Sequence, residues 1–186
     1  ELSAEEYRVT DQALVIPGVP PLFELTTTTW ILPQENTCLE GLYRSGKLFC
    51  TQCEAQGFRR ITYYPDRPDV MARFTVTIEA EKSQYPVMLS NGNPIAEGHT
   101  GAGRHWMTWA DPFPKPSYLF ALVAGDLRWV EDRFTTTSGR EVMLRIYVEP
   151  CNLDKCEHAM ASLKRAMRWD EVAYGREYDL DRFNIV

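Results

Sequence analysis

The amino-acid sequence predicts a mostly β protein, an antiparallel β-sandwich or curved sheet followed by the start of an α/β unit with one long helix. Short runs of β-branched and aromatic residues recur at regular spacing through the first 125 residues, separated by turn-forming clusters. One helical stripe of apolar residues follows near the end of the chain. The sequence then becomes strand-like again up to Val186, as expected for the opening of an α/β unit.

The first predicted strands flank a proline-rich turn. Ala13–Ile16 is a short apolar run, and it ends at the turn formed by residues 17–21. Leu22–Leu32 then alternates apolar and polar residues with period two, the pattern of a half-buried strand. Ala72–Ala80 alternates in the same way, so one face of this strand should be apolar.

The middle of the chain predicts further strands joined by tight turns. These strands are Pro86–Ser90, His105–Trp109 and Tyr118–Ala124. Residues 91–94 (Asn-Gly-Asn-Pro) predict a hairpin, because Asn-Gly accepts the positive φ of a type I′ turn. The Gly-rich residues 98–103 are predicted to be a hairpin tip. The proline-rich residues 111–116 are predicted to separate two strands.

After Gly125 the pattern changes. Leu127–Thr136 and Glu141–Val148 predict a hairpin that turns at Ser138-Gly139. The only long helix follows, with Asn152 as expected N-cap and Gly175 as the residue that ends it. Its apolar face is predicted from steps of three and four residues at Leu153, Cys156, Met160, Leu163 and Met167. Tyr178–Val186 should begin a new strand.

Length, charge and cysteine content limit the class of protein. The 186 residues suffice for one domain, or for one plus part of a second, and the missing initiator Met suggests a processed or excised chain. The net charge of −6 argues against a nucleic-acid scaffold, which needs a basic surface. No apolar stretch approaches the roughly 18 residues of a membrane span. No signal peptide is visible, so we expect five reduced cysteines in a cytoplasmic protein.

Cys50 and Cys53 form a C-x-x-C pattern with three interpretations. A redox role would place the pair at a helix N-terminus, whereas the surrounding sequence is β and loop. A zinc site would need a second pair of ligands, for which His99 and His105 are candidates at a loose spacing. We favour the third interpretation, in which both cysteines are small buried apolar side chains.

Motifs for nucleotide binding, for a catalytic serine and for an H-E-x-x-H zinc helix are absent from the sequence. Three polar residues, Glu40, Gln52 and Glu54, stand in otherwise apolar or Gly-rich sequence. Such a carboxylate can form a cation site or be solvated. The residues alone therefore leave the function open.

Several long strings are more distinctive than any short motif. They are Asn36–Asp69 (NTCLEGLYRSGKLFCTQCEAQGFRRITYYPDRPD), Tyr85–Asn93, Asp111–Pro116, Tyr118–Gly125, Ser162–Lys164, Trp169–Glu171 and Glu177–Asp181. Together they resemble the bacterial alanyl aminopeptidases of the M1 zinc metallopeptidase family, from about residue 36 onward. Residues 1–35 match less distinctively.

This resemblance implies a division of the chain. Residues 1–125 would be the latter part of the family's saddle-like N-terminal β domain, and residues 126–186 the truncated beginning of its thermolysin-like catalytic domain. The family's G-A-M-E-N loop, H-E-x-x-H helix and third zinc ligand are not in these 186 residues. We therefore expect no catalytic residue, no zinc ligand and no activity in this chain alone. Zinc would belong to the full-length enzyme, and the rest of that catalytic chain would be this part's partner.

The resemblance also implies a role for Gln52 and Glu54. In the family's T-Q-C-E string, Gln and Glu line the pocket for the free N-terminus of a peptide substrate. A carboxylate can accept a charge-assisted hydrogen bond from an ammonium group, and a Gln carbonyl can accept a second N–H. Glu54 would position the substrate without taking a proton. The alternative is a structural ion pair between Glu54 and Arg59 or Arg60.

Three hypotheses follow. The first is part of a zinc-dependent aminopeptidase that removes N-terminal amino acids from peptides. The second is a stand-alone β-sandwich binding module without catalysis, and the third is a C-x-x-C zinc or redox protein. The gene sequence beyond Val186 would separate the first hypothesis from the other two.

Overall fold

The computed structural model describes residue 3 and residues 5–186, and in this part the chain forms four β-sheets and one α-helix. The sheets are, in strand order, β1 (Arg8–Val9) and β2 (Leu14–Val15); β3 (Gly41–Ser45), β4 (Leu48–Gln52), β9 (Leu122–Gly125) and β6 (Val87–Ser90); β5 (Met71–Glu81), β8 (Arg104–Pro116) and β7 (Asn93–Gly101); and β10 (Arg128–Thr135), β11 (Glu141–Val148) and β12 (Arg182–Ile185). Strand pairing is antiparallel except between β11 and β12. The mostly β fold class with one long helix is confirmed.

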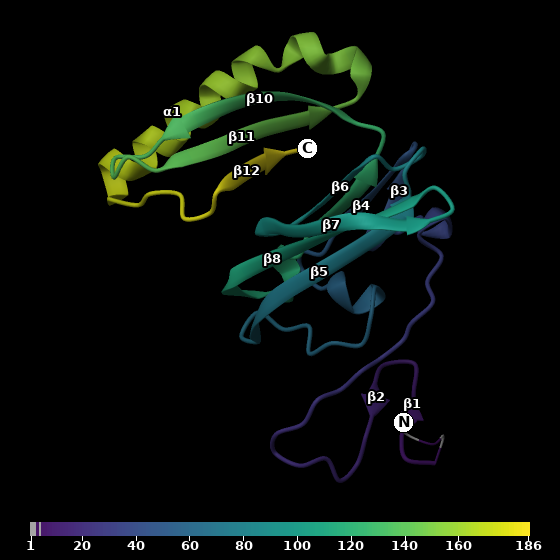
Figure 1. The fold of residues 1–186 in the computed structure, drawn as a ribbon. Helices are drawn as coiled ribbons and strands as arrows, with labels where there is room; N and C mark the ends of the chain where they lie inside the picture. Colours follow the sequence, from purple (N-terminus) through teal and green to yellow (C-terminus); the bar gives the residue numbers. More distant parts are fainter. Residues whose placement is uncertain (1–2, 4) are drawn as a thin grey trace.

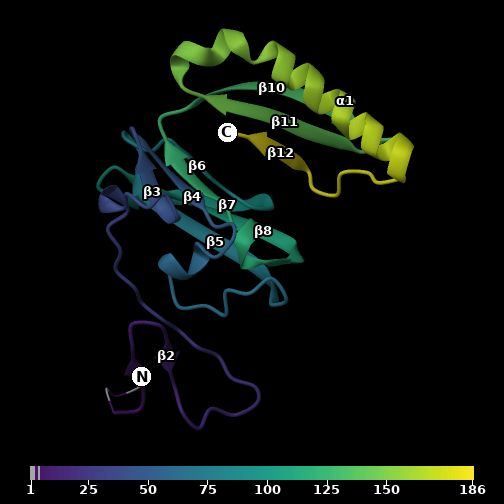
Figure 2. The ribbon, with the colours of Figure 1, turned by 180° about the vertical axis from the view of Figure 1, so that it is seen from behind.

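The elements are stacked along the molecule. Helix α1 (Glu157–Tyr174) covers one face of the β10–β11–β12 sheet (Figure 1). The β3–β4–β9–β6 and β5–β8–β7 sheets come next, and the small β1–β2 hairpin lies at the far end, as the view from behind also shows (Figure 2). The segment between β11 and β12 contains α1, which gives the long connection that parallel strands require.

The predicted hairpin and helix are present in the C-terminal part. Strands β10 and β11 pair from Arg128 with Val148 to Thr135 with Glu141. Four of the five predicted stripe residues are buried together with Phe134 and one face of β11, in a cluster of Phe134, Val142, Leu144, Ile146, Cys156, Met160, Leu163 and Met167. The prediction is wrong for Leu153, which lies ahead of α1 and is 37% exposed. Burial of the cluster is the main stabilising contribution to the unit. In the described part of the chain no helix has the length and apolarity to cross a membrane.

The start of the helix differs from the prediction, whereas its end does not. Pro150–Lys155 forms a short 3₁₀ helix, η4, and α1 begins only at Glu157, so Asn152 is not its N-cap. A proline at the first position of η4 is compatible with either kind of turn, which is why the sequence did not separate them. Gly175 ends α1 in the left-handed conformation, with φ of 63°.

Leu22–Leu32 is not a strand, contrary to the prediction. The segment is extended, but among the described residues no strand pairs with it. Its side chains make scattered contacts, such as the hydrogen bond from Thr29 to the Ile61 carbonyl (3.2 Å). Leu22 and Trp30 are 90% and 88% exposed. Alternation predicts the direction of side chains, but a strand also needs the backbone of a neighbour.

The Asn-Gly pair does not form a hairpin either. Asn91 and Gly92 carry the chain from β6 into β7, which belongs to a different sheet. Gly92 does have the positive φ that the pattern suggests, at 86°. A Cβ atom at this position would lie 2.1 Å from the carbonyl oxygen of Ala110, so both conformation and space require glycine. The true β7–β8 turn is at residues 102–103, within the predicted hairpin tip.

Residues 111–116, predicted to break the strands, form the second half of β8. Strand β7 pairs with β8 only as far as Ala110, so beyond this residue that edge of β8 has no pairing strand in the described part of the chain. Proline lacks an N–H donor and is tolerated at such an edge while β5 pairs on the other side, with a bulge between Ala72 and Phe74. The next predicted strand is shortened, because residues 117–119 form the 3₁₀ helix η3.

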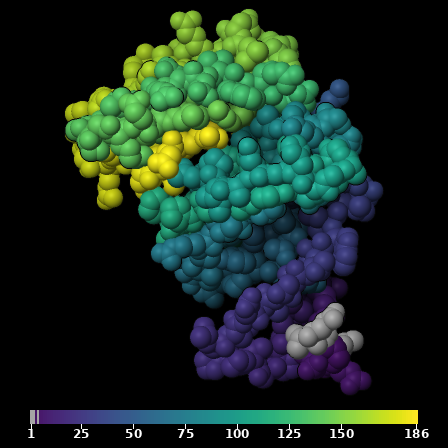
Figure 3. Space-filling model, in the orientation of Figure 1, coloured from purple at the N-terminus to yellow at the C-terminus, as the bar shows by residue number. Residues whose placement is uncertain are grey.

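A second apolar cluster joins the sheets that contain β6 and β8 to the β10–β12 unit. It consists of Val87, Leu89, Trp109, Leu127 and Tyr147. The Trp109 side chain is fully buried, and its indole N–H donates to the carbonyl of Met88 at 3.1 Å. In the space-filling view the yellow C-terminal strand lies directly against the teal part of the chain (Figure 3). The two parts of the molecule therefore share a packed, apolar contact.

Candidate functional site

Gln52 and Glu54 lie together at the end of strand β4. Gln52 is the last residue of the strand and pairs with Gly41, while Glu54 opens the following turn. Cys53, between them, is 2% exposed, whereas Gln52 and Glu54 are exposed. The side-chain amide of Gln52 donates to the backbone carbonyl of Glu54 at 3.1 Å. The peptide bond between Glu54 and Ala55 is cis.

A close-packed turn holds the two residues in place. The Gly57 N–H donates to the Cys53 carbonyl at 2.8 Å, which closes the turn. A Cβ atom on Gly57 would lie 2.4 Å from the Gln52 carbonyl oxygen, so only glycine fits against the end of β4. Phe58 then anchors the turn in an aromatic cluster, with its ring centroid 5.0 Å from those of Tyr64 and Phe120.

The Glu54 carboxylate is not part of a structural ion pair, so the alternative interpretation of Glu54 is wrong. Arg59 Nε contacts Asp66 at 3.2 Å, and Arg60 Nε contacts Glu40 at 2.7 Å. Both arginines are thus already paired with other carboxylates. Across residue 3 and residues 5–186, Glu54 makes neither a side-chain hydrogen bond nor a salt bridge. Its carboxylate is available to a cation from outside the chain.

Asp66 is the buried acid beneath this turn. Its side chain is 2% exposed and accepts hydrogen bonds from the Ser117 hydroxyl (2.6 Å) and the Arg59 backbone N–H (3.0 Å). Burial alone would raise the pKa of Asp66, but these hydrogen bonds and the Arg59 guanidinium outweigh it and lower the pKa below its ordinary value. Asp66 therefore stabilises the turn as a carboxylate.

The C-x-x-C cysteines do not have the surroundings of a redox or metal site. Burial, and secondarily the charge of Asp66, raises the pKa of the Cys53 thiol to about 11, which disfavours the reactive thiolate. Cys50 is half-buried on β4, and neither cysteine is in a disulfide. Within the described ranges, no group of three or more His, Cys, Asp and Glu side chains could hold a metal ion. His105, which was a candidate zinc ligand, instead contacts the Tyr85 carbonyl through its Nε2 at 2.8 Å.

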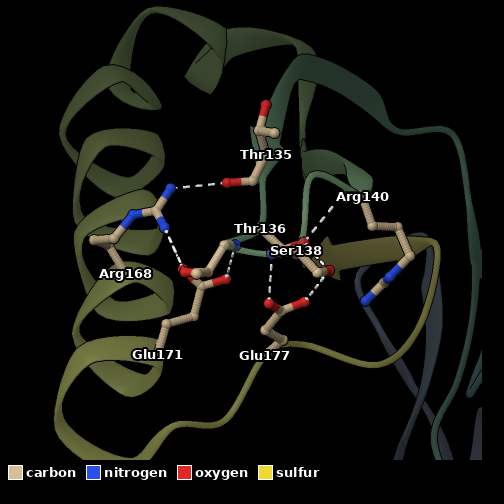
Figure 4. Close-up of polar contacts among 8 residues, drawn as sticks. Thr135, Thr136, Ser138, Arg140, Arg168, Glu171 and Glu177 are labelled. Carbon is tan, nitrogen blue, oxygen red and sulfur yellow. Dashed lines mark hydrogen bonds and ion pairs between the residues drawn. The ribbon is translucent and has the colours of Figure 1, made fainter.

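A pair of carboxylates away from this site, which the sequence did not indicate, holds the β10–β11 turn (Figure 4). Glu171 from α1 accepts the Thr137 N–H and hydroxyl at 3.1 and 3.0 Å. Glu177, in the segment after α1, accepts the Ser138 N–H and hydroxyl at 2.7 and 2.6 Å. Each carboxylate therefore binds a backbone amide and a hydroxyl of one turn residue, and Arg168 also pairs with Glu171. This pair has a structural role.

A large cavity lies beside the candidate site and does not include it. Its volume is about 1080 Å³, and it lies between the N-terminal segment and residues 55–67. Ala55 and Gln56 line it, so it begins next to Glu54, although Gln52 and Glu54 are not among its lining residues. Sequence patterns did not indicate this cavity, because its walls come from segments far apart in the chain.

The structure combines antiparallel β-sheets with a three-stranded sheet covered by one helix, and Glu54 at the end of β4 has an exposed carboxylate with no partner among the described residues. Residues 23–119, just over half of the chain, match the Peptidase M1 N-terminal domain. The chain therefore belongs to the M1 peptidase family, as the strings in its sequence indicated.

Relatives within this family are very similar to the chain. It is 58% identical over 185 residues to Aminopeptidase N of Caulobacter vibrioides, covering 100% of this chain and 21% of the relative. It is 60% identical over 174 residues to Aminopeptidase N of Escherichia coli, covering 94% and 20%. The crystal structure of Legionella pneumophila aminopeptidase A in complex with aspartic acid has a TM-score of 0.89 and 39% identity, covering 98% of this chain and 22% of that one. The chain thus spans about a fifth of the length of these curated relatives.

Proposed function

We propose that this chain is part of a zinc-dependent aminopeptidase that removes N-terminal amino acids from peptides, and that Gln52 and Glu54 bind the free amine of the substrate. The observation that carries this proposal is the Glu54 carboxylate, which is exposed and unpaired within the described ranges while neighbouring Arg59 and Arg60 are paired elsewhere. Relatives that match nearly the whole chain are aminopeptidases, which supports the class of substrate.

The geometry suits recognition of an ammonium group. The amide nitrogen of Gln52 donates to the Glu54 backbone carbonyl, so the amide oxygen of Gln52 is left as an acceptor beside the carboxylate in this proposal. An ammonium group offers three donors and would pair with both acceptors. An internal peptide bond offers no cation, so it would leave the carboxylate unpaired and be rejected. The Legionella relative binds aspartic acid, whose α-amine is such a cation.

The described residues do not gather a zinc site, so we propose that the zinc ligands and the hydrolytic centre are supplied by sequence outside these 186 residues. In this proposal residues 1–125 belong to the N-terminal β domain, and residues 126–186 begin the catalytic domain. Gln52 and Glu54 orient the substrate and take no proton. We therefore expect the chain alone to lack peptidase activity. We also expect the whole enzyme to be cytoplasmic.

The decisive experiment uses the full-length protein and an alanine anilide substrate. Wild-type protein should hydrolyse the free-amine substrate and leave its N-acetylated form intact. Glu54→Ala should lower kcat/KM by about 10- to 100-fold, the range expected for a lost charge-assisted hydrogen bond. The matched control is Glu40→Ala, a nearby exposed carboxylate that already pairs with Arg60 and should leave kcat/KM near wild type.

Unchanged kinetics in Glu54→Ala would remove this residue from the site. Hydrolysis of the acetylated substrate at the same rate would overturn amine recognition altogether. A gene that ends at Val186 would favour the alternative, a stand-alone β-sandwich binding module.

A further inference from the structure

The crossing segment, residues 91–93, makes side-chain contacts that its role as a chain connection does not require. Asn91 Nδ2 donates to the Leu119 carbonyl at 2.9 Å, and Asn91 Oδ1 accepts the Ala121 N–H at 2.7 Å. The Asn91 side chain therefore takes the place of a neighbouring strand for the loop that leads into β9. This contact fixes the loop relative to the crossing segment.

The same loop is held from its other side by the strand that carries the candidate site. The Leu122 N–H donates to the Thr51 hydroxyl at 2.9 Å, and Thr51 directly precedes Gln52. Strands β4 and β9 are also paired through Phe49 with Ala124 and Cys50 with Val123. A short chain of directional contacts thus leads from Gln52 to Asn91.

Asn93, two residues further on, connects to the other part of the molecule. Its Nδ2 donates to Asp181 Oδ2 at 3.0 Å, and the Asp181 N–H donates back to Asn93 Oδ1 at 3.1 Å. Asp181 immediately precedes β12, and its carbonyl accepts the Met143 N–H of β11 at 2.9 Å. The reciprocal pair therefore connects β7 to the edge strand of the β10–β12 sheet.

We propose that the crossing segment is the joint that aligns the Gln52–Glu54 site with the β10–β12 unit, and that Asn93 is a positioning residue acting through Asp181. The apolar cluster around Trp109 holds the two parts together, but apolar contact is not directional. Two opposed hydrogen bonds are directional and set one register. The catalytic consequence rests on the proposed function, because the amine site lies on one side of this joint and the hydrolytic centre is assigned to the other.

The test is a charge exchange across the pair in the full-length protein. Asn93→Asp places two carboxylates face to face and should push β12 away. Adding Asp181→Asn restores the side-chain hydrogen bond with donor and acceptor reversed, while the backbone N–H of residue 181 still donates to the side chain of residue 93. We expect Asn93→Asp to lower kcat about fivefold to tenfold, since small misplacements of reacting groups are costly. The double variant should return to within about twofold of wild type.

Two further readouts separate positioning from a general loss of structure. The inhibition constant of a simple alkylamine, which occupies only the amine site, should stay unchanged in Asn93→Asp. Ser138→Ala is the matched control, because it loosens the segment after α1 only from within the C-terminal unit, at Glu177. It should retain its kcat. Unchanged kcat in Asn93→Asp, or no recovery in the double variant, overturns the inference.

An inactive wild-type protein would overturn the proposed function, but it would not test whether the Asn93–Asp181 contact aligns the two parts of the molecule. Amide hydrogen exchange in β12 then decides it. Faster exchange of residues 182–185 in Asn93→Asp, reversed in the double variant, supports the alignment. Exchange that is identical in all three proteins overturns it.

Discussion

Arg59 and Asp66 are joined by three hydrogen bonds. The Arg59 backbone N–H and Nε both donate to Asp66 Oδ2, at 3.0 and 3.2 Å, and a guanidinium nitrogen donates to the Asp66 carbonyl at 2.8 Å. This contact directs Arg59 away from Glu54, five residues before it. The neighbouring cation is thereby removed from the candidate site, and the Glu54 carboxylate is left available.

Asp66→Asn should destabilise the protein by about 1–3 kcal/mol at pH 7, because a buried charged acceptor of several hydrogen bonds is lost. The folded-state pKa of Asp66 is lowered from 3.8, so its contribution is complete above that value and is lost as the pH falls through the lower folded pKa. Urea unfolding at pH 7 and at pH 3 measures the difference between wild type and variant. A difference that grows on acidification would contradict the assignment.

Cys53 should react slowly with iodoacetamide at pH 8. Its thiol is buried and its pKa is raised to about 11, so little thiolate is present. Cys38 and Cys151 are exposed and should be labelled first. Mass spectrometry of peptides after timed labelling gives the order. Labelling of Cys53 as fast as Cys38 would revive the redox interpretation of the C-x-x-C pattern.

Gly92→Ala should cost about 3 kcal/mol or more of stability, since the new methyl group meets the Ala110 backbone at a positive φ. The matched control is Gly139→Ala. Gly139 has nearly the same φ, 89°, but nothing lies within 4 Å of its Cβ position, so only the strain of about 1–2 kcal/mol should remain. Thermal unfolding of both variants checks the prediction. Equal losses would show that space around Gly92 is irrelevant.

Glu171→Ala should cost about 2–3 kcal/mol, because it leaves the Thr137 N–H and Arg168 without their buried partner. Glu177→Ala, which removes the less buried carboxylate that binds Ser138 of the same turn, should have the smaller effect. Chemical denaturation compares the two variants, and hydrogen exchange at the Thr137 amide reports the local opening. The reverse order of stability would assign the main structural role to Glu177.

Hydrophobic periodicity correctly predicted the helix and the strand that each pack through one apolar face. The stripe through Met160 and Met167 packs on the sheet as expected, and Ala72–Ala80 lies within β5 with its apolar face inward. The candidate site residues were found through the string that contains Gln52 and Glu54, and the structure places these two side by side. Their role in amine binding stays a prediction for the kinetic test.

The sequence by itself determined the mostly β class, the long helix and the family to which the chain belongs. Only the tertiary structure decided which groups meet. Leu22–Leu32 has a strand pattern without a pairing strand in the described part of the chain, and Arg60 pairs with Glu40, 20 positions away. Asn93 meets Asp181 across 88 positions. Local patterns report how a segment folds along its own axis, whereas hydrogen-bond partners depend on which distant segments the packed core brings together.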